Sequence, residues 1–313
     1  MVGIVILDYN NASDTINCID SVVSHTKGDN YKFVVVENGS KKTTEDEMRN
    51  FVERRFADAQ VIGEEYSSVK TLPCMTLLLS KTNDGYARGN NKALRLLDKD
   101  EEIDAILILN NDILFIEDII NPLYEYLRKL PDCGIVSPLL VTRDGVTIDH
   151  SCARKDSTKS QFFYDALFTY KDIAGIISRC WYRRCYLQNN PGLLKEEYFN
   201  IELPSGSCMM IDKGLFRQIG YFDEGTFLYF EENILYRKLL AVNKVNYLIT
   251  GVRCIHLGAA TSKKVASLFT VGCQMKSTSY YLRKYRKAPL LAKFVDVMSH
   301  VTKLKIRIQS LWR

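Results

Sequence analysis

The N-terminal part of the chain alternates short apolar runs with longer polar stretches. Runs made mainly of Val, Ile, Leu and Phe, bounded by turn-forming residues, cover Val2–Leu7, Phe33–Val36, Thr76–Leu79 and Ala105–Leu109. Such runs are typical of strands buried on both faces of a parallel sheet. Intervening segments such as Ser13–Ser24 and Asn90–Leu97 suit crossover helices. The first 115 residues are therefore predicted to form a Rossmann-like α/β unit.

The pattern is weaker further along the chain. A helical stretch is expected from Asp112 to Leu130, and regular alternation returns at Leu203–Ile211 and continues to Ser262. Residues 144–200 interleave aromatic and basic side chains: Phe162, Phe163, Tyr164, Phe168, Tyr170, Trp181, Tyr182, Arg183, Arg184 and Tyr186. This region is interpreted as a lid over an acceptor, a membrane-facing surface or an ordinary helical subdomain.

Polar clusters follow three of the predicted strands. They are Asp8–Asn11, Glu37–Ser40 and Asn110–Asp112. Single clusters of Asn, Asp and Gly are usual in loops. Ligands of open α/β sheets bind beyond the carboxyl ends of the strands, so three clusters at strand ends favour a binding site there.

Charge is distributed unevenly along the chain. The net charge is +5, yet the segment from Lys263 to Arg313 holds twelve Lys or Arg against one acid, Asp296, a net +11 that leaves −6 on the first 262 residues. Apolar residues in this tail recur at three- and four-residue steps: Leu291, Phe294, Met298, Val301, Leu304, Ile308 and Leu311. The tail is predicted to be a basic amphipathic helix that binds an anionic membrane surface, unless its apolar stripe packs on the rest of the protein.

Cysteine usage and hydropathy indicate the compartment. The nine cysteines are scattered without a Cys-x-x-Cys pair, no secretory leader is evident, and no stretch holds the ~18–20 apolar residues of a membrane span. We expect free thiols, a cytoplasmic protein and peripheral contact with the inner face of the membrane.

Eight motifs, in order, resemble the family-2 inverting glycosyltransferases of GT-A fold, especially the rhamnosyltransferase-like branch that builds bacterial surface polysaccharides. The motifs are Ile6–Asn11, Val34–Ser40, Asn83–Asn91, Leu109–Asp112, Gly206–Ile211, Gly220–Glu224, Tyr229–Glu232 and His256–Gly258. The resemblance implies a GT-A catalytic domain over residues 1–262, with a donor-binding half (1–115) and an acceptor half (116–262), followed by a helical extension (263–313). It also implies transfer of a sugar from a nucleoside diphosphate donor to a saccharide or lipid-linked saccharide.

The resemblance assigns a divalent cation, Mn²⁺ or Mg²⁺, to Asp112 and His256. A carboxylate-held cation neutralises the charge that develops on a diphosphate leaving group. The family has an Asp-x-Asp motif ending at Asp112, and Asn110 replaces its first carboxylate. Outside the resemblance, Asp112 also fits a loop residue, and a lone His is commonly a hydrogen-bonded structural residue.

An inverting transfer needs a base within hydrogen-bond reach of the acceptor hydroxyl. The family register assigns this role to Glu232, with Glu231 in reserve. Both are predicted to open a helix, where the dipole alone also favours acids. Ile234 stands where the family usually has another acid.

Donor binding is expected at the strand ends and at one glycine-rich segment. Glu37 can accept hydrogen bonds from a ribose or base, and backbone N–H groups around Gly85 can face the donor, unless these residues only cap a helix. The complete predicted donor set is Asp8, Tyr9, Glu37, Asn38, Gly85, Gly89, Asn90, Asn110 and Asn111.

Other nucleotide enzymes fit less well. Residues 8–15 contain no glycine, which argues against a sugar nucleotidyltransferase, an NAD-dependent enzyme with Gly-x-Gly-x-x-Gly, and a P-loop enzyme. A non-catalytic subunit of the same fold remains the alternative, supported by Asn110 and Ile234. No nucleic-acid partner is expected. The donor remains open between UDP and dTDP sugars, and between rhamnose, galactose and glucose types.

Overall fold

The computed structural model describes residues 1–65, 70–168, 181, 183–258 and 268–311. A single large sheet forms the centre of the molecule, with strand order β3-β4-β2-β1-β5-β11-β7-β12-β6, and β9 pairs with β12. The strands are β1 (Val2–Asp8), β2 (Tyr31–Asn38), β3 (Gln60–Gly63), β4 (Met75–Ser80), β5 (Ala105–Asn110), β6 (Ile113–Phe115), β7 (Cys133–Val141), β9 (Tyr198–Ile201), β11 (Cys208–Asp212) and β12 (Val245–His256). A separate two-stranded sheet pairs β8 (Ala153–Arg154) with β10 (Leu203–Pro204).

The N-terminal half is a parallel α/β unit. β1 pairs in parallel with β2 and β5, and β2 with β4. Neighbouring side chains of β1 enter different cores: Ile4 and Ile6 pack in one cluster and Val5 in the other. The apolar runs are unbroken because helices cover both faces of this half of the sheet.

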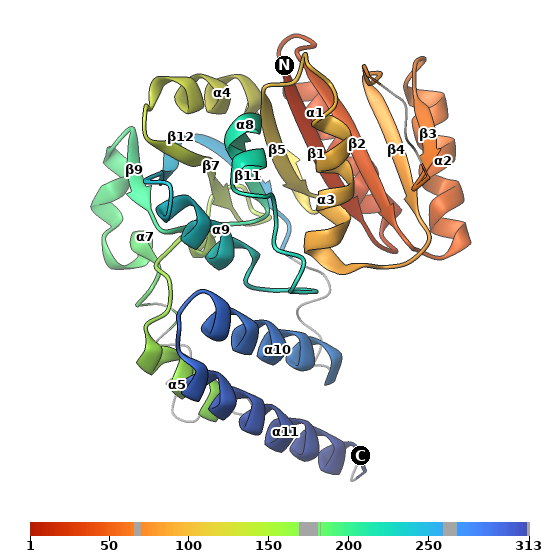
Figure 1. Cartoon of the computed structure of the whole chain (residues 1–313). Coiled ribbons are helices and arrows are strands. Elements are labelled where there is room, and N and C mark those ends of the chain that lie inside the picture. Colours follow the sequence, from red (N-terminus) through yellow and green to blue (C-terminus); the bar gives the residue numbers. More distant parts are fainter. Residues whose placement is uncertain (66–69, 169–180, 182, 259–267, 312–313) are drawn as a thin grey trace.

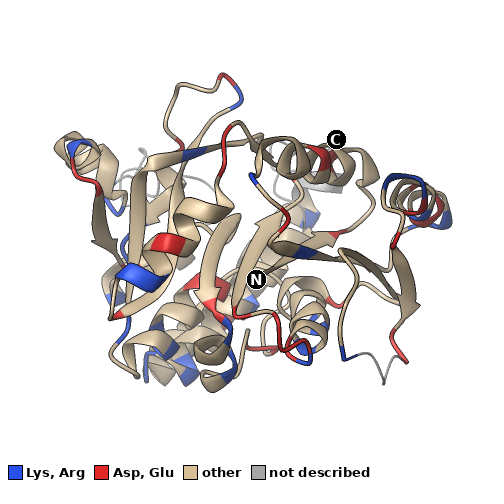
Figure 2. Ribbon diagram, turned by 90° about the horizontal axis from the view of Figure 1, so that it is seen from above, with Lys and Arg blue, Asp and Glu red and all other residues tan. Residues whose placement is uncertain are grey.

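Helices divide between the two faces of the sheet (Figure 1). The first core cluster takes side chains from α1 (Ala12–His25), α2 (Lys42–Arg55) and α4 (Ile120–Lys129). The second takes them from α3 (Gly85–Leu97), α8 (Lys213–Gln218) and α9 (Glu231–Leu240). In Figure 2 the strands are mostly tan, whereas charged residues gather on helices and loops, as expected for a sheet buried on both faces.

The second half of the sheet is mixed. β11 runs antiparallel between β5 and β7, while β12 is parallel to β7 and antiparallel to β6 and β9. The expected helix from Asp112 is only partly correct, because the short strand β6 precedes α4. The weakly patterned region contains short elements, namely η1 (His150–Cys152), α5 (Lys159–Phe168), α7 (Tyr186–Asn189) and η3 (Pro191–Lys195).

The C-terminal segment forms two long helices, α10 (Leu268–Lys284) and α11 (Pro289–Leu311), which lie against each other and α5 below the sheet (Figure 1). A third core cluster joins them to α5 and α9 through Phe162, Ile234, Tyr281 and Val295. The structure confirms the mixed α/β sheet flanked by helices, with a C-terminal helical extension. The boundary at residue 262 stays a prediction.

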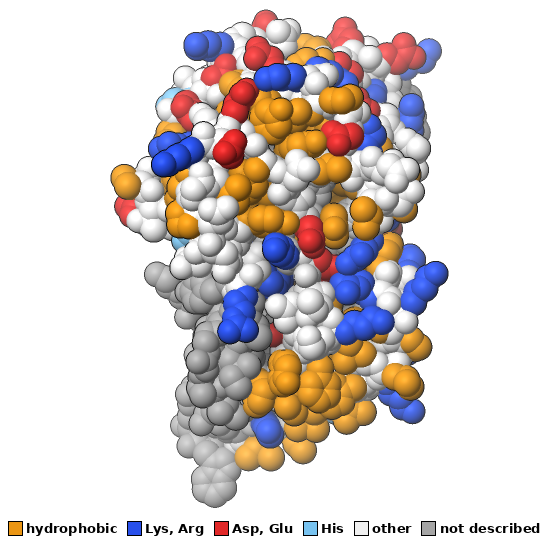
Figure 3. Space-filling view, turned by 90° about the vertical axis from the view of Figure 1, so that its left-hand side faces the viewer, with side chains coloured by type: hydrophobic (Ala, Val, Ile, Leu, Met, Phe, Trp, Pro, Cys, Tyr) orange, Lys and Arg blue, Asp and Glu red, His pale blue; other side chains and the backbone are white. Residues whose placement is uncertain are grey.

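The predicted tail stripe divides into two parts. Leu291, Phe294 and Met298 pack on the third core cluster, whereas Val301, Leu304 and Ile308 are exposed. The side chain of Leu311 lies outside the described residues. Figure 3 shows hydrophobic side chains gathered at the helical end of the molecule, next to a band of Lys and Arg.

Several tail cations have acidic partners, contrary to expectation. Arg283 pairs with Asp296 of the tail itself, Lys284 with Asp223 at 2.7 Å, and Arg286 with Asp156 at 2.6 Å. These partners reduce the unbalanced charge that the sequence count indicates. No helix in the described part of the chain is long and apolar enough to cross a membrane. The described cysteines are free thiols, and Cys180 lies outside the described residues.

Candidate active site

The parallel register brings the polar strand ends together. Asp8 lies opposite Glu37 in the β1–β2 pair, and Asn110 lies opposite Leu7 in the β1–β5 pair. The three predicted clusters therefore occupy one edge of the sheet, because carboxyl ends of parallel strands coincide.

Asp8 is fully buried at this edge. Its Oδ1 accepts hydrogen bonds from the Thr15 hydroxyl at 2.7 Å and the Asn111 amide at 3.4 Å, while Oδ2 has no partner among the described residues. Burial, aided by the charge of Glu37, outweighs these bonds and raises the pKa of Asp8 to about 6. Tyr9, the next residue, is half exposed.

Glu37 and Asn38 hold neighbouring loops in place. The Glu37 carboxylate accepts the backbone N–H of Ser40 at 2.7 Å, and the Asn38 amide donates to the Asn83 side chain at 3.0 Å. Both side chains are buried. One oxygen of Glu37 is thus already used within the protein, and its contact with a nucleotide stays a prediction.

The glycine-rich segment differs from the expected loop. Helix α3 already begins at Gly85, which has a φ of +80°, and a Cβ there would lie 2.2 Å from the Phe227 carbonyl oxygen. Gly89 packs against Leu7, and the Asn90 amide donates to the carbonyl of Tyr86.

The first backbone N–H groups of α3 have partners within the protein. Gly85 N–H donates to the Asn83 side chain at 2.9 Å and Tyr86 N–H to the Phe227 carbonyl at 2.8 Å. Close packing of α3 accounts for both glycines, and a contact of these N–H groups with the donor stays a prediction.

Asp112 and His256 meet at the end of the sheet, although far apart in the sequence. His256 ends β12, and its Nε2 lies 3.3 Å from Asp112 Oδ2; on the other side of the ring, Nδ1 lies 2.7 Å from Asp149 Oδ2. Burial alone would lower the pKa of His256, but bonds to both carboxylates raise it to about 9. Burial alone would raise the pKa of Asp149. The hydrogen bonds that its carboxylate accepts from His256 and Ser151 outweigh burial and lower this pKa to about 2.

This pair fits the chemistry of a divalent cation. Two ligands at about 2.1 Å and at right angles around one ion lie about 3 Å apart, close to the 3.3 Å between His256 and Asp112. Asp112 Oδ1 is buried without a partner among the described residues. Asp149 holds the far nitrogen of the ring, as carboxylates commonly do behind a metal-bound imidazole. No group of three His, Cys, Asp or Glu suited to a metal occurs in the described ranges, so an ion here would take other ligands from water and phosphate.

Ser207 connects this pair to a pocket. Its hydroxyl lies 3.3 Å from His256 Nε2 and accepts from the Asn110 amide at 3.3 Å. Ser207 and Asn110 also line a cavity of about 380 Å³ between the sheet and the C-terminal helices. Asn110 thus contacts the Ser207 hydroxyl. An Asp at position 110, the residue usual in the family motif, would reach the same hydroxyl.

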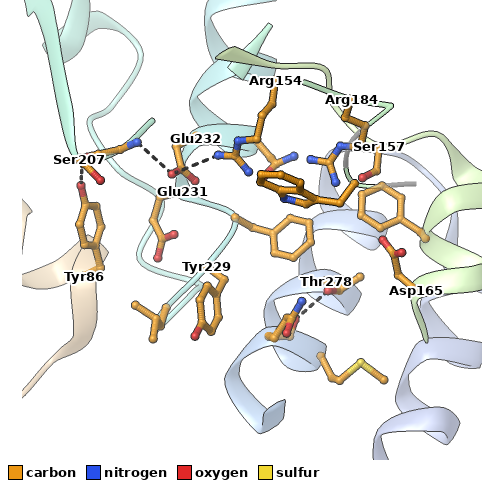
Figure 4. Close-up of a pocket in the computed structure, with 18 of the residues that line it drawn as sticks. Tyr86, Arg154, Ser157, Asp165, Arg184, Ser207, Tyr229, Glu231, Glu232 and Thr278 are labelled. Atoms are coloured by element: carbon orange, nitrogen blue, oxygen red, sulfur yellow. Dashed lines mark hydrogen bonds and ion pairs between the residues drawn. The ribbon is translucent and has the colours of Figure 1, made fainter. Parts of the chain in front are cut away.

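Glu231 and Glu232 both line this pocket (Figure 4). Glu232 Oε1 accepts the Gly206 backbone N–H at 3.1 Å and lies 3.7 Å from Arg154 Nη2. Tyr86 fixes the same loop, since its hydroxyl donates to the Gly206 carbonyl at 2.9 Å.

Glu231 has a different environment. Its side chain is buried, and Oε1 has no partner among the described residues. Burial and the adjacent Glu232 raise the pKa of Glu231 to about 8. Glu231 is therefore held as the neutral acid at neutral pH, whereas Glu232 has a guanidinium 3.7 Å away.

The backbone before α9 sets the position of both acids. Tyr229 and Phe230 have φ values of +73° and +76°, a left-handed conformation that is uncommon for aromatic residues. Phe230 is kept there by Phe162 and Tyr281, whose rings lie 5.9 and 5.4 Å away. Packing against α5 and α10 thus supports the turn that carries Glu231 and Glu232 into the pocket.

Ile234 has a packing role. It is 1% exposed and belongs to the third core cluster, on the side of α9 that faces the helical extension. An acid there would be buried among apolar side chains, so the departure from the family pattern is explained by the added helices.

Several pocket residues were missed from the sequence. Arg154, Arg184 and Asp165 line the cavity, and Asp149 supports His256. All four lie in residues 144–200, whose pattern did not predict where their side chains would lie. Ser207 was quoted only as part of a motif.

Comparison with known proteins agrees with this arrangement. The sequence pattern of Glycosyl transferase family 2 matches residues 3–220. The chain belongs to this family. A curated relative, the low-salt glycan biosynthesis hexosyltransferase Agl10 of Haloferax volcanii, is 26% identical over 217 residues, which are 67% of this chain and 61% of that protein.

A solved structure has the same fold. GalNAc-T7, crystallised with UDP, GalNAc and Mn²⁺, superposes with a TM-score of 0.59 at 14% identity, over 95% of this chain and 54% of that one. The sheet and helices described above are thus a GT-A fold. The chain spans about three fifths of the curated relative's length and about half of the solved chain's.

Proposed function

We propose that this family 2 protein is an inverting glycosyltransferase that moves a hexosyl unit from a nucleoside diphosphate donor to a saccharide or lipid-linked saccharide. The observation that carries the proposal is Glu232, a carboxylate in a cavity joined through Ser207 to the pair Asp112 and His256. The proposed base thus lines a cavity whose wall, at Ser207, adjoins residues suited to a diphosphate-bound cation, an arrangement that fits transfer.

Glu232 acts as the general base. It takes the proton of the acceptor hydroxyl while that oxygen forms a bond to the anomeric carbon, and the bond from this carbon to the donor phosphate breaks. The electron pair leaves with the nucleoside diphosphate. The Gly206 N–H and the Arg154 guanidinium orient the carboxylate. Glu231, held neutral, is the reserve assignment.

Asp112 and His256 would hold Mn²⁺ or Mg²⁺, with Asp149 orienting the imidazole. The cation supplies Lewis-acid neutralisation of the charge on the diphosphate. The donor nucleotide, a UDP or dTDP, would lie along the strand ends lined by Asp8, Tyr9, Glu37, Asn38, Asn110 and Asn111.

The pathway is proposed from the resemblance and the relative. The motifs resemble rhamnosyltransferase-like enzymes of surface polysaccharide synthesis, and the curated relative is named for a role in glycan biosynthesis. A cell-surface polysaccharide or glycan made on the cytoplasmic side of the membrane is the proposed product class.

Peripheral membrane contact would bring such an acceptor within reach. Leu290, Val297, Val301, Leu304 and Ile308 are exposed along α11, at steps that keep them near one side of the helix. Cations such as Lys293 stand on the same exposed helix and would favour an anionic surface.

The membrane contact can be tested with vesicles. The double variant Leu304→Ser with Ile308→Ser should lose co-sedimentation with anionic vesicles, whereas Val146→Ser, at a residue 81% exposed in a distant loop, should not. Equal recovery of the double variant and the wild type in the pellet would contradict the proposed contact.

The catalytic proposal is tested by sugar transfer. Purified protein with Mn²⁺ is assayed for release of UDP or dTDP from hexose donors, with and without lipid-linked saccharide acceptors. The alternative is a non-catalytic subunit that binds the donor without turnover. Saturable nucleotide binding with no release from any donor would favour that alternative.

A further inference from the structure

Two arginines lie on adjoining segments at the pocket. Arg154 belongs to β8 and forms a β-bridge with Cys185, the residue after Arg184. The Nε of Arg154 donates to the Ser151 carbonyl at 3.1 Å, and that of Arg184 to the Lys155 carbonyl at 2.9 Å. Each side chain is thus anchored through Nε, which leaves its terminal nitrogens for other partners.

Those terminal nitrogens lack a full set of acceptors. Arg154 Nη2 is 3.7 Å from Glu232, longer than a hydrogen bond. Among the residues that the structure describes, none accepts a hydrogen bond from the terminal nitrogens of Arg184. Burial and the charge of Arg154 lower the pKa of Arg184, and the charges of Asp165 and Asp156 offset this only in part. The two cations are therefore held near each other at a cost.

A bound anion would relieve this cost. Guanidinium groups present planar pairs of N–H donors that match phosphate and carboxylate oxygens. In Figure 4 the guanidinium group of Arg154 points toward Glu232, and that of Arg184 lies near Ser157, with Asp165 below them on α5. The cavity of about 380 Å³ lies within the size range of sites for small ligands.

The position of the pair indicates which substrate carries the anion. Arg154 adjoins Glu232, the proposed base for the acceptor hydroxyl, whereas the pair Asp112 and His256, suited to the donor diphosphate, lies beyond Ser207. We propose that Arg154 and Arg184 bind an anionic group, a phosphate or a carboxylate, on the acceptor saccharide. This inference rests on the proposed function for the identity of the acceptor side.

Binding can be measured without turnover. Titration calorimetry with α-D-glucose 1-phosphate, D-glucuronate and neutral methyl α-D-glucoside separates phosphate, carboxylate and uncharged sugar. We compare wild type with Arg184→Gln and Arg184→Lys, and with Arg183→Gln, the adjacent exposed arginine, as matched control. UDP with Mn²⁺ is titrated into each variant to report on the donor side.

We expect an anionic probe to bind the wild type and the Arg183→Gln protein equally. Hydrogen bonds to charged groups are worth about 1.5–3 kcal/mol, so Arg184→Gln should weaken this binding roughly 10–100-fold and Arg184→Lys less, with UDP affinity unchanged. Preference for glucose 1-phosphate identifies a phosphate acceptor, and preference for glucuronate a carboxylate one.

Three results would overturn the inference: no saturable binding of either anionic probe, equal binding of the neutral glucoside, or an equal loss of UDP affinity in Arg184→Gln. Loss of sugar transfer alone would bear on the proposed function. Anion binding that depends on Arg184 in a protein without transferase activity would leave this inference standing and remove the proposed reaction.

Discussion

Replacement of Glu231 by Gln tests the electrostatics of the pocket directly. Gln has nearly the shape of the protonated acid and carries no charge at any pH. The pKa of Glu231 rises from an ordinary 4.5 to about 8 in the folded protein, because the side chain is buried beside Glu232. Between these two values the folded chain keeps a proton that the unfolded chain releases. Stability therefore falls as pH rises through this window.

The magnitude follows from the width of the window. One pKa unit corresponds to about 1.4 kcal/mol. At pH 7, about 2.5 pH units above the pKa of the unfolded chain, the folded chain still holds the proton. This lowers the free energy of unfolding by about 3 kcal/mol, and Glu231→Gln should remove the loss. Below pH 4.5 the acid is protonated in both states, and the variant and the wild type should be equally stable.

Denaturant unfolding at pH 4, 5.5, 7 and 8.5 measures the effect. The stability gain of Glu231→Gln should be near zero at pH 4, grow through pH 7 and level off above pH 8. Glu101→Gln, at an exposed glutamate, serves as the control and should show no such trend. A gain that is constant with pH, or a loss of stability at pH 7, would refute the proposed burial of a neutral acid.

Further predictions concern the base, the cation pair and the buried network. Glu232→Gln should retain donor binding and lose transfer by ~10²–10⁴-fold, because an amide cannot take the proton; an active Glu232→Gln beside an inactive Glu231→Gln would move the base by one residue. Asp112→Ala and His256→Ala should lose Mn²⁺-dependent binding of UDP in calorimetry while keeping wild-type circular dichroism; unchanged affinity in both would remove the cation site. Asp156→Asn should cost up to about 3–5 kcal/mol of unfolding free energy, because it leaves the partly buried Arg237 and Arg286 without their carboxylate partner. Tyr281→Phe, which loses a hydrogen bond to Asp156 and one from Arg237, should cost roughly 1–2 kcal/mol. Equal losses in the two variants would argue against a charge effect.

The sheet was predictable from sequence because its strands are long apolar runs buried on both faces. Val2–Leu7 and Ala105–Leu109 form β1 and β5 almost as expected. β6 has three residues, too few to establish a period, and was taken as part of a helix. The start of α3 was misplaced because its glycines and asparagines have loop composition, while close packing on Phe227 and Leu7 requires them there.

The residues of the candidate site could be proposed from sequence where they belong to motifs that end strands. Asp112 and His256 were found through family motifs, and their proximity follows from antiparallel pairing of β6 with β12. Arg154 and Arg184 gave no periodic signal, because their position depends on pairing between short irregular segments. The acids that pair with Lys284 and Arg286 lie more than sixty positions upstream along the chain. Counting charges within the tail segment therefore could not reveal these ion pairs.

The contacts of Asp156 also limit where the chain can be truncated. Its carboxylate binds Arg237 of α9, Tyr281 of α10 and Arg286 beyond α10, and it stands two residues after Arg154. A chain shortened before α10 would expose the third core cluster and leave this acid without its C-terminal partners. Deletion therefore cannot separate the proposed surface attachment from the proposed sugar transfer, and residues 1–262 alone should be a poor starting point for engineering or for crystals.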